Sequence, residues 1–259
     1  MKAIVHHHYG PADLLSVEDI DKPTAGDNEV PIGVRAASVN PVDWHYMRGA
    51  PYAVRMGGGL RQPKDLRLGV DVAGRVEAVG RDVTQFKPGD AVFGSCRGAF
   101  AEYARTSESA LVMKAENLTF EQAAERVIDY TREDFTTTGQ RYDTILDCVG
   151  NHSLSDRRRA LTDTGTLVLV GGPDEGRWLG PLAGVLAAVV LSRFVSQNLV
   201  MILASLSREG DLATLRDLMA AGTVTPVIDR RYGLTEVPEA IRYLEEGHAR
   251  GKVVITIAP

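Results

Sequence analysis

The sequence contains little cysteine, and its cysteines are far apart. Cys96 and Cys148 are the only two among 259 residues, and no C-x-x-C pair occurs. Disulfide scaffolds and structural zinc sites both need several cysteines at short spacing. The sequence therefore supports neither, and we expect both cysteines to be small buried residues rather than nucleophiles.

Long runs of one charge sign or of apolar residues are also absent. Lys and Arg total 29 against 34 Asp and Glu, giving a net charge of −5, and the only basic cluster is at 156–160. This balance argues against nucleic acid as a partner. The longest apolar region, 178–206, is interrupted by Arg193 and by polar residues, whereas a membrane span needs about 20 apolar residues. We expect a buried helix there, with membrane contact as the alternative, and a cytoplasmic protein without a membrane span.

Histidine clusters at the N-terminus, where residues 6–8 are all histidine. On a strand His6 and His8 would share one face, which is the arrangement of two metal ligands. A closed metal site needs further ligands, and none is identifiable nearby. We therefore interpret the three histidines as surface residues and predict no metal site.

The first 110 residues carry strand and turn patterns. Residues 29–39 and 69–80 alternate apolar and polar positions, and 86–94 place a Pro-Gly-Asp turn before a short strand. Short strands with frequent Gly and Pro are typical of a β-barrel-like domain. The polar, glycine-rich residues 51–65 are expected to form a loop that covers or borders a site.

After residue 124 strands alternate with helices, which implies a parallel sheet with helices packed on it. Three apolar stretches are expected to be strands of this sheet, and two amphipathic helices and a last strand follow them. The strands are expected at 126–130, 142–149 and 165–172, the helices at 131–135, 153–162, 211–222 and 237–247, and the last strand at 252–259.

Six motifs occur in a family-specific order. They read RAASVNPVDWHYMRG, LGVDVAGRVEAVG, FKPGDAVFG, GAFAEYA, YDTILDCVG and EAIRYLEEGHARGKVVI. Together they resemble the zinc-independent, quinone oxidoreductase-like branch of the medium-chain dehydrogenase/reductase family, over nearly the whole chain. The resemblance implies a GroES-like β-barrel domain joined to a Rossmann-like parallel sheet with helices. It places the GroES-like catalytic domain at 1–124, a truncated Rossmann-like domain at 125–232, and a segment returning to the catalytic domain at 233–259.

Metal-using relatives place a cysteine zinc ligand where Asn40 stands, and Gly-His-Glu where Gly69, Val70 and Asp71 stand. Asparagine and valine are poor zinc ligands. The resemblance therefore implies hydride transfer from NADPH, or NADH, to a quinone, enone or carbonyl without zinc.

One expected part of the nucleotide-binding domain is missing. A dinucleotide site needs a strand, a G-x-G-x-x-G turn and a helix, so that the backbone can approach the pyrophosphate. No such stretch exists here. By the resemblance, two strand-plus-helix steps of roughly 60 residues are lacking between Ala124 and Arg126. Their loss would either bring the strand at 126–130 beside the strand at 142–149 or leave an apolar sheet edge open for another chain, which allows a homo-oligomer.

Two sets of site residues follow from the resemblance. Asn40, Asp43, Tyr46 and Tyr52 are the candidate catalytic residues, because hydrogen-bond donors must stabilise the electron-rich oxygen where no metal does so. Asn40 could instead be a turn residue, Asp43 a helix cap and Tyr46 a half-buried core residue. The nicotinamide side of the cofactor site is expected at Val149, Gly150, Asn151, Gly171 and Gly172.

Two kinds of function remain open. The first is an NAD(P)H-dependent oxidoreductase acting on a small molecule, favoured by the retained motifs. The second is a non-catalytic truncated remnant or binding module that has lost its dinucleotide site, favoured by the missing glycine-rich turn. An artefactual loss of the segment from the sequence is a third reading.

Overall fold

The computed structural model describes residues 1–120, 141–147, 153–170, 196–201, 210–247 and 249–257. They form two compact units, which we treat separately. Unit 1 comprises 1–49, 54–129 and 206–259, and unit 2 comprises 50–53 and 130–205. The predicted domain boundaries at 124/125 and 232/233 stay predictions, although residues 206–259 cluster with the N-terminal part of the chain.

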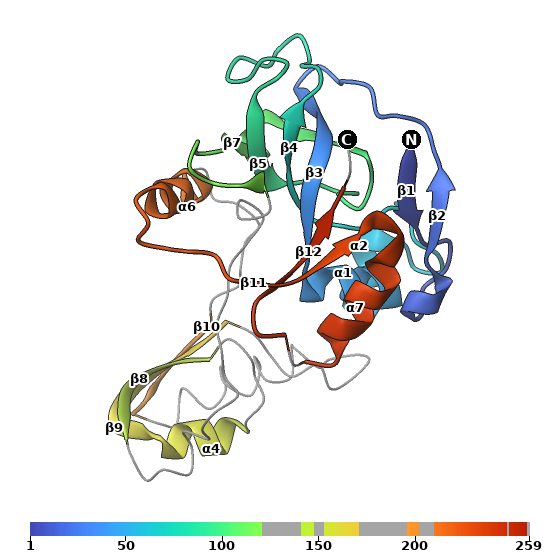
Figure 1. Cartoon of the computed structure of the whole chain (residues 1–259). Coiled ribbons are helices and arrows are strands. Elements are labelled where there is room, and N and C mark those ends of the chain that lie inside the picture. The colour runs from blue at the N-terminus through green and yellow to red at the C-terminus, as the bar shows by residue number, and fades with distance from the viewer. Residues whose placement is uncertain (121–140, 148–152, 171–195, 202–209, 248, 258–259) are drawn as a thin grey trace. The chain divides into compact units, whose positions relative to one another are not determined.

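Unit 1 is built on one long strand, β3 (Glu29–Val39), which pairs antiparallel with three others. The sheet runs in the order β11-β12-β3-β4-β5-β7, with β6 also paired to β3, so the described pairings form an open sheet (Figure 1). The other strands are β4 (Asp71–Val76), β5 (Ala91–Ser95), β6 (Tyr103–Ser107), β7 (Leu111–Met113), β11 (Ile228–Gly233) and β12 (Lys252–Thr256), and a separate pair is β1 (Lys2–Val5) with β2 (Ser16–Asp19).

The burial of most residues of β3 agrees with its central position in the sheet. Ile32, Val34 and Val39 are among its fully buried side chains, and they belong to the main hydrophobic core of unit 1. Burying one such side chain contributes roughly 1.5–3 kcal/mol. The buried side chains of β3 therefore stabilise the sheet of unit 1. The first candidate site residue, Asn40, comes immediately after this strand in the sequence.

The C-terminal segment completes this sheet. β12 pairs antiparallel with β3, with Val253 opposite Val39, and β11 pairs parallel with β12. This pairing brings the last strand beside the residues that precede the first helix.

Two helices of unit 1, α6 (Asp211–Ala220) and α7 (Val237–Glu245), were predicted from the sequence patterns. Two others, α1 (Pro41–Arg48) and α2 (Ala53–Gly58), were not predicted as helices. Because α2 lies within residues 51–65, the expectation of a loop there is corrected. Figure 1 shows α7 beside α1, and the two are in contact. The short 3-10 turns are η1 (Ala12–Leu14), η2 (Glu108–Ala110) and η3 (Leu234–Glu236).

The described part of unit 2 is a small parallel sheet. It has the order β10-β9-β8, from β8 (Tyr142–Asp147), β9 (Leu161–Leu169) and β10 (Asn198–Met201), with α4 (Leu154–Arg159) beside it. A parallel sheet with a helix is the arrangement predicted for this half of the chain. The strand β10 corrects the expectation of a continuous helix over 178–206.

A buried ion pair fastens α4 to the end of β8. Arg157 Nε lies 2.6 Å from Asp147 Oδ2, with side chains only 5% and 8% exposed. Buried charges are tolerated only when paired, so this contact fixes the helix beside the carboxyl end of the strand. No helix in the described ranges is long and apolar enough to cross a membrane.

Candidate active site

The first candidate residues lie where β3 passes into α1. Asn40 precedes the helix, and its backbone N–H donates to Asp43 Oδ2 at 2.7 Å. This is the reciprocal contact of a capping box, and Pro41 at the first helical position suits the same end. The helix therefore begins where the sequence places Asn-Pro-x-Asp, and it fixes Asp43 and Tyr46 on one element.

The side chain of Asn40 belongs to a polar network. Its Nδ2 donates to Asp71 Oδ2 at 2.9 Å, and it lies 3.2 Å from the Ser38 carbonyl oxygen and 3.3 Å from Ser38 Oγ. Ser38 Oγ donates to the same Asp71 oxygen at 2.8 Å. Both amide hydrogens of Asn40 are thus directed at protein acceptors. The Asn40 amide is therefore occupied by protein acceptors in this structure.

Lys252 completes the network from the last strand. Its Nζ donates to Asn40 Oδ1 at 2.6 Å and lies 3.9 Å from Asp71 Oδ2, and its side chain is 15% exposed. The ammonium therefore fixes which way the Asn40 amide faces and compensates the Asp71 carboxylate. The sequence patterns did not single out Lys252, and only the β3–β12 pairing explains its position.

Asp43 is fully buried, and desolvation raises the pKa of its carboxyl to about 8. This value is the net result of several causes: desolvation is the largest, the Asp71 carboxylate acts in the same direction, and the Asn40 N–H, the Lys252 ammonium and the Gly69 N–H act against them. Asp43 Oδ1 has no partner of hydrogen-bonding geometry among the described residues. At neutral pH the group is therefore mostly a neutral carboxylic acid, which can donate a hydrogen bond.

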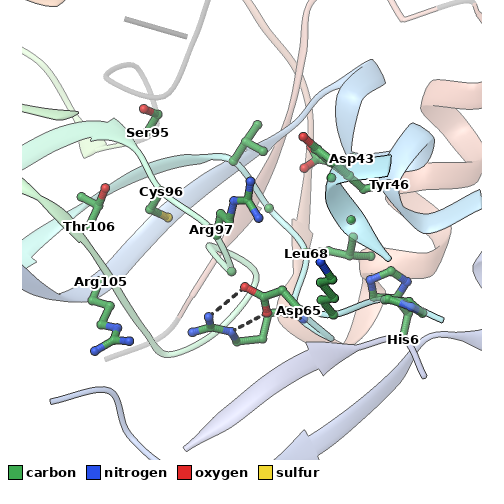
Figure 2. A pocket seen from close by; sticks show the side chains of 18 of the residues that line it. His6, Asp43, Tyr46, Asp65, Leu68, Ser95, Cys96, Arg97, Arg105 and Thr106 are labelled. Atoms are coloured by element: carbon green, nitrogen blue, oxygen red, sulfur yellow. Dashed lines mark hydrogen bonds and ion pairs between the residues drawn. The ribbon is translucent and has the colours of Figure 1, made fainter. Parts of the chain in front are cut away.

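A cavity of about 720 Å³ opens beside Asp43 and Tyr46, within unit 1. His6, Asp65, Leu68, Cys96 and Arg97 also lie on its lining (Figure 2). This volume lies within the range that binds small organic ligands. The cavity and the two candidate side chains together form the candidate active site.

His6 corrects the interpretation of the histidine cluster as surface residues. It is only 2% exposed, and its Nδ1 is buried without a hydrogen-bond partner among the described residues. Burial lowers its pKa, so the ring is mostly neutral at pH 7. His7, by contrast, is exposed and pairs with Glu18 at 3.0 Å. Within the described ranges, no three His, Cys, Asp or Glu side chains are arranged to hold a metal.

Cys96 is buried on the cavity wall, as expected for a small core residue. Desolvation raises the pKa of its thiol well above the ordinary range. A thiol in this state is a poor nucleophile. Cys148 lies outside the described residues.

The remaining predicted site residues are not all placed. Tyr52 falls in unit 2, so its distance from Asn40, Asp43 and Tyr46 is not defined. Val149, Gly150, Asn151, Gly171 and Gly172 lie outside the described residues, as does the junction between Ala124 and Arg126. Their proposed roles stay predictions.

The described part of unit 2 bears on the fit of a dinucleotide. β8 and β9 are parallel and end at Asp147 and Leu169, immediately before the predicted nicotinamide-side residues. Ligands bind at such carboxyl ends in open α/β sheets. The pyrophosphate half does not fit in the same way, because the sequence has no G-x-G-x-x-G turn.

Comparison with known proteins assigns the family. A family model described as zinc-binding dehydrogenase matches residues 122–255, and one described as alcohol dehydrogenase GroES-like domain matches 26–116. The chain belongs to the zinc-binding dehydrogenase family. This confirms the resemblance to medium-chain dehydrogenases/reductases and the two-part GroES-like and Rossmann-like fold class.

Two curated relatives illustrate the range of similarity. Quinone oxidoreductase of Sus scrofa is 37% identical over 133 residues, covering 50% of this chain and 38% of the relative. NADPH-dependent alkenal/one oxidoreductase of Arabidopsis thaliana is 25% identical, covering 100% of this chain and 80% of the relative. That alignment spans 340 positions against 259 residues here, which agrees with a truncated chain.

Solved structures share the fold. Quinone oxidoreductase from Coxiella burnetii has a TM-score of 0.78 at 24% identity, covering 100% of this chain and 99% of that one. Escherichia coli quinone oxidoreductase complexed with NADPH has a TM-score of 0.76 at 18% identity, covering 99% and 100%. At these identities the likeness concerns the fold alone.

Proposed function

We propose that the chain is an NADPH-dependent oxidoreductase that reduces a quinone, enone or other small carbonyl compound without zinc. The observation that carries this proposal is the alignment that covers all of this chain and 80% of the alkenal/one oxidoreductase, combined with a cavity lined by Asp43 and Tyr46 of α1. A nicotinamide cofactor, when bound, supplies the hydride.

The residues of this chain supply polarity and protons. Tyr46 and Asp43 line the same cavity, and Asp43 Oδ1 is buried without a partner among the described residues. In its neutral form Asp43 donates a hydrogen bond to the substrate oxygen, and Tyr46 offers a second donor. Donors fixed in advance stabilise the negative charge that develops on this oxygen.

Asn40 has an indirect role in this proposal. Its side-chain hydrogens are directed at Asp71 and Ser38, and its backbone N–H donates to Asp43. It therefore positions the acid and does not touch the substrate. By the resemblance, Asn40 occupies the position of a zinc ligand in metal-using relatives. The positively charged Lys252 ammonium lies beside it and would repel a zinc ion, which supports chemistry without zinc.

The non-catalytic remnant is the less supported alternative, and only the missing glycine-rich turn favours it. Residues 149–151 and 171–172 remain the proposed nicotinamide-side contacts. A cytoplasmic location and pairing of copies through a sheet edge also remain predictions.

Steady-state oxidation of NADPH with a quinone and with a neutral enone tests the proposal. Turnover should survive dialysis against a metal chelator, and Tyr46→Phe should lower kcat by about 10²-fold, the typical loss of one oxyanion donor. Tyr103→Phe is the matched control, because Tyr103 lies on β6 and not on the cavity lining. Absence of turnover with every acceptor, or equal rates for both variants, would contradict the proposed roles.

A further inference from the structure

The cavity lining carries more basic than acidic side chains, in a chain of net charge −5. Two of its basic groups are compensated. Arg67 makes two hydrogen bonds of 3.0 Å to Asp65, and Arg105 lies 2.9 Å from Glu29. The charged side chains on the lining are Lys64, Arg67, Arg97 and Arg105 against Glu29, Asp43 and Asp65.

Lys64 and Arg97 are the basic groups left over. Both are exposed, and among the described residues neither side chain forms an ion pair or hydrogen bond. Arg97 interacts electrostatically with Asp65, but the Asp65 carboxylate already accepts hydrogen bonds from Arg67. Asp43 is mostly neutral at pH 7, since burial raises its pKa to about 8. The cavity therefore presents two positive charges without matching negative ones.

The backbone places two of these arginines opposite each other. Arg97 and Arg105 are partners in an isolated antiparallel bridge, so their Cβ atoms lie on the same face. Like charges directly opposite one another are unfavourable in a sheet. Figure 2 shows their guanidinium groups turned apart, with that of Arg97 directed toward the side of the cavity where Asp43 and Tyr46 lie.

Two buried polar atoms on the same lining also make no hydrogen bond with the residues that the structure describes. They are His6 Nδ1 and Asp43 Oδ1, whose residues are 2% and 0% exposed. The backbone of Gly69 lies near Asp43 and that of Asp65 near His6, but neither Oδ1 nor Nδ1 makes a hydrogen bond of good geometry, so a polar ligand would satisfy both atoms. The cavity therefore offers polar groups at its buried end and positive charge at its exposed rim.

We propose that this cavity binds a keto acid: a small carbonyl compound whose carboxylate lies at Arg97 and Lys64 and whose carbonyl oxygen lies at Asp43 and Tyr46. Arginine binds planar carboxylates through two parallel hydrogen bonds, which suits this anion. The proposal names the substrate class of the proposed reductase. The position of the ketone end of the ligand rests on that proposed function. The position of the charged end rests on the cavity alone.

Calorimetric titration of the full chain without cofactor tests the charged end. The probes are 3-benzoylpropionate and its methyl ester, which share the ketone and differ in the carboxylate. The acid should bind about tenfold more tightly than the ester, the ratio expected for one charge-assisted hydrogen bond, and added salt should reduce the difference. Equal affinities, or no binding of either probe, would overturn the proposal.

Two variants locate the anion. Arg97→Gln should reduce the preference for the acid to what Lys64 alone provides, while leaving the affinity of the ester unchanged. Arg81→Gln is the matched control, since Arg81 is exposed, pairs with Asp27 and is absent from the lining. Both positions are exposed, so both variants should fold. A preference that is undiminished in Arg97→Gln, or equally reduced in Arg81→Gln, would overturn the assignment.

Turnover on the same preparations separates this inference from the proposed function. Acid binding without any NADPH-dependent reduction would contradict the proposed function and leave the anion site in place. Reduction of a neutral enone without any preference for the acid would contradict the anion site and leave the proposed function in place.

Discussion

The Lys252 ammonium donates a hydrogen bond of 2.6 Å to the side-chain oxygen of Asn40. These residues are 212 positions apart in the chain, and the pairing of β12 with β3 brings them together. The end of the chain thereby positions the start of α1, the helix that carries Asp43 and Tyr46. We therefore expect the geometry of the candidate site to depend on this contact.

Replacing Lys252 with methionine should destabilise unit 1. The change leaves Asn40 Oδ1 and Asp71 without their cation in a largely buried place, which costs about 1–3 kcal/mol. Lys2→Met is the control, because the Lys2–Asp19 pair is exposed (56% and 76%) and should change stability by about 0.5 kcal/mol or less. Denaturant unfolding measures both variants. Equal, small effects would show that the network does not stabilise the protein.

Asp43 should make stability depend on pH. Its folded pKa of about 8 lies above the ordinary value of 3.8, so the native state keeps a proton that the unfolded chain releases. The stability from this proton is complete below the unfolded pKa and is lost as pH rises through about 8. His6 has a lowered pKa and acts with the opposite sign, at and below about pH 6.5.

The melting temperature should therefore fall between about pH 6.5 and 8.5, a window above the His6 transition. Asp43→Asn keeps the shape of the side chain and an acceptor for the Asn40 N–H, but it cannot titrate. Its melting temperature should vary less over the same window. An identical decline in the variant would show that another group is responsible.

The buried Asp147–Arg157 pair should matter more than its exposed counterpart in unit 2. Arg157→Met removes a cation from beside a buried carboxylate, and such losses cost about 3–5 kcal/mol. Arg141→Met is the control, because the Arg141–Asp163 pair is 59% and 90% exposed. Hydrogen exchange of the β8 amides reports on this unit directly. Unchanged protection in Arg157→Met would contradict the importance of this ion pair.

The sequence predicted the elements whose patterns are local. The alternation in 29–39 became β3, and the amphipathic stretches at 211–222 and 237–247 became α6 and α7. It did not predict α2 in the glycine-rich segment, since such composition is more common in loops. It also missed β10, because a short apolar run is compatible with either a strand or a helix.

The candidate site was predictable only in part. Asn40, Asp43 and Tyr46 could be proposed because they share one short motif. Lys252 and His6 could not, because their positions depend on strand pairing and on burial by distant segments. Lys252 is the first residue of an apolar strand, and His6 is one of three consecutive histidines. Neither local sequence indicates that the side chain will be buried.

The proposed function requires that a chain without the glycine-rich turn still binds a nicotinamide cofactor. Titration of the purified, monodisperse protein with NADPH and with NADH, following nicotinamide fluorescence and melting temperature together, tests it most directly. We predict saturable binding and a raised melting temperature, because a ligand that binds the folded state stabilises it. No binding up to millimolar cofactor, in a protein that melts cooperatively, would contradict the proposed function.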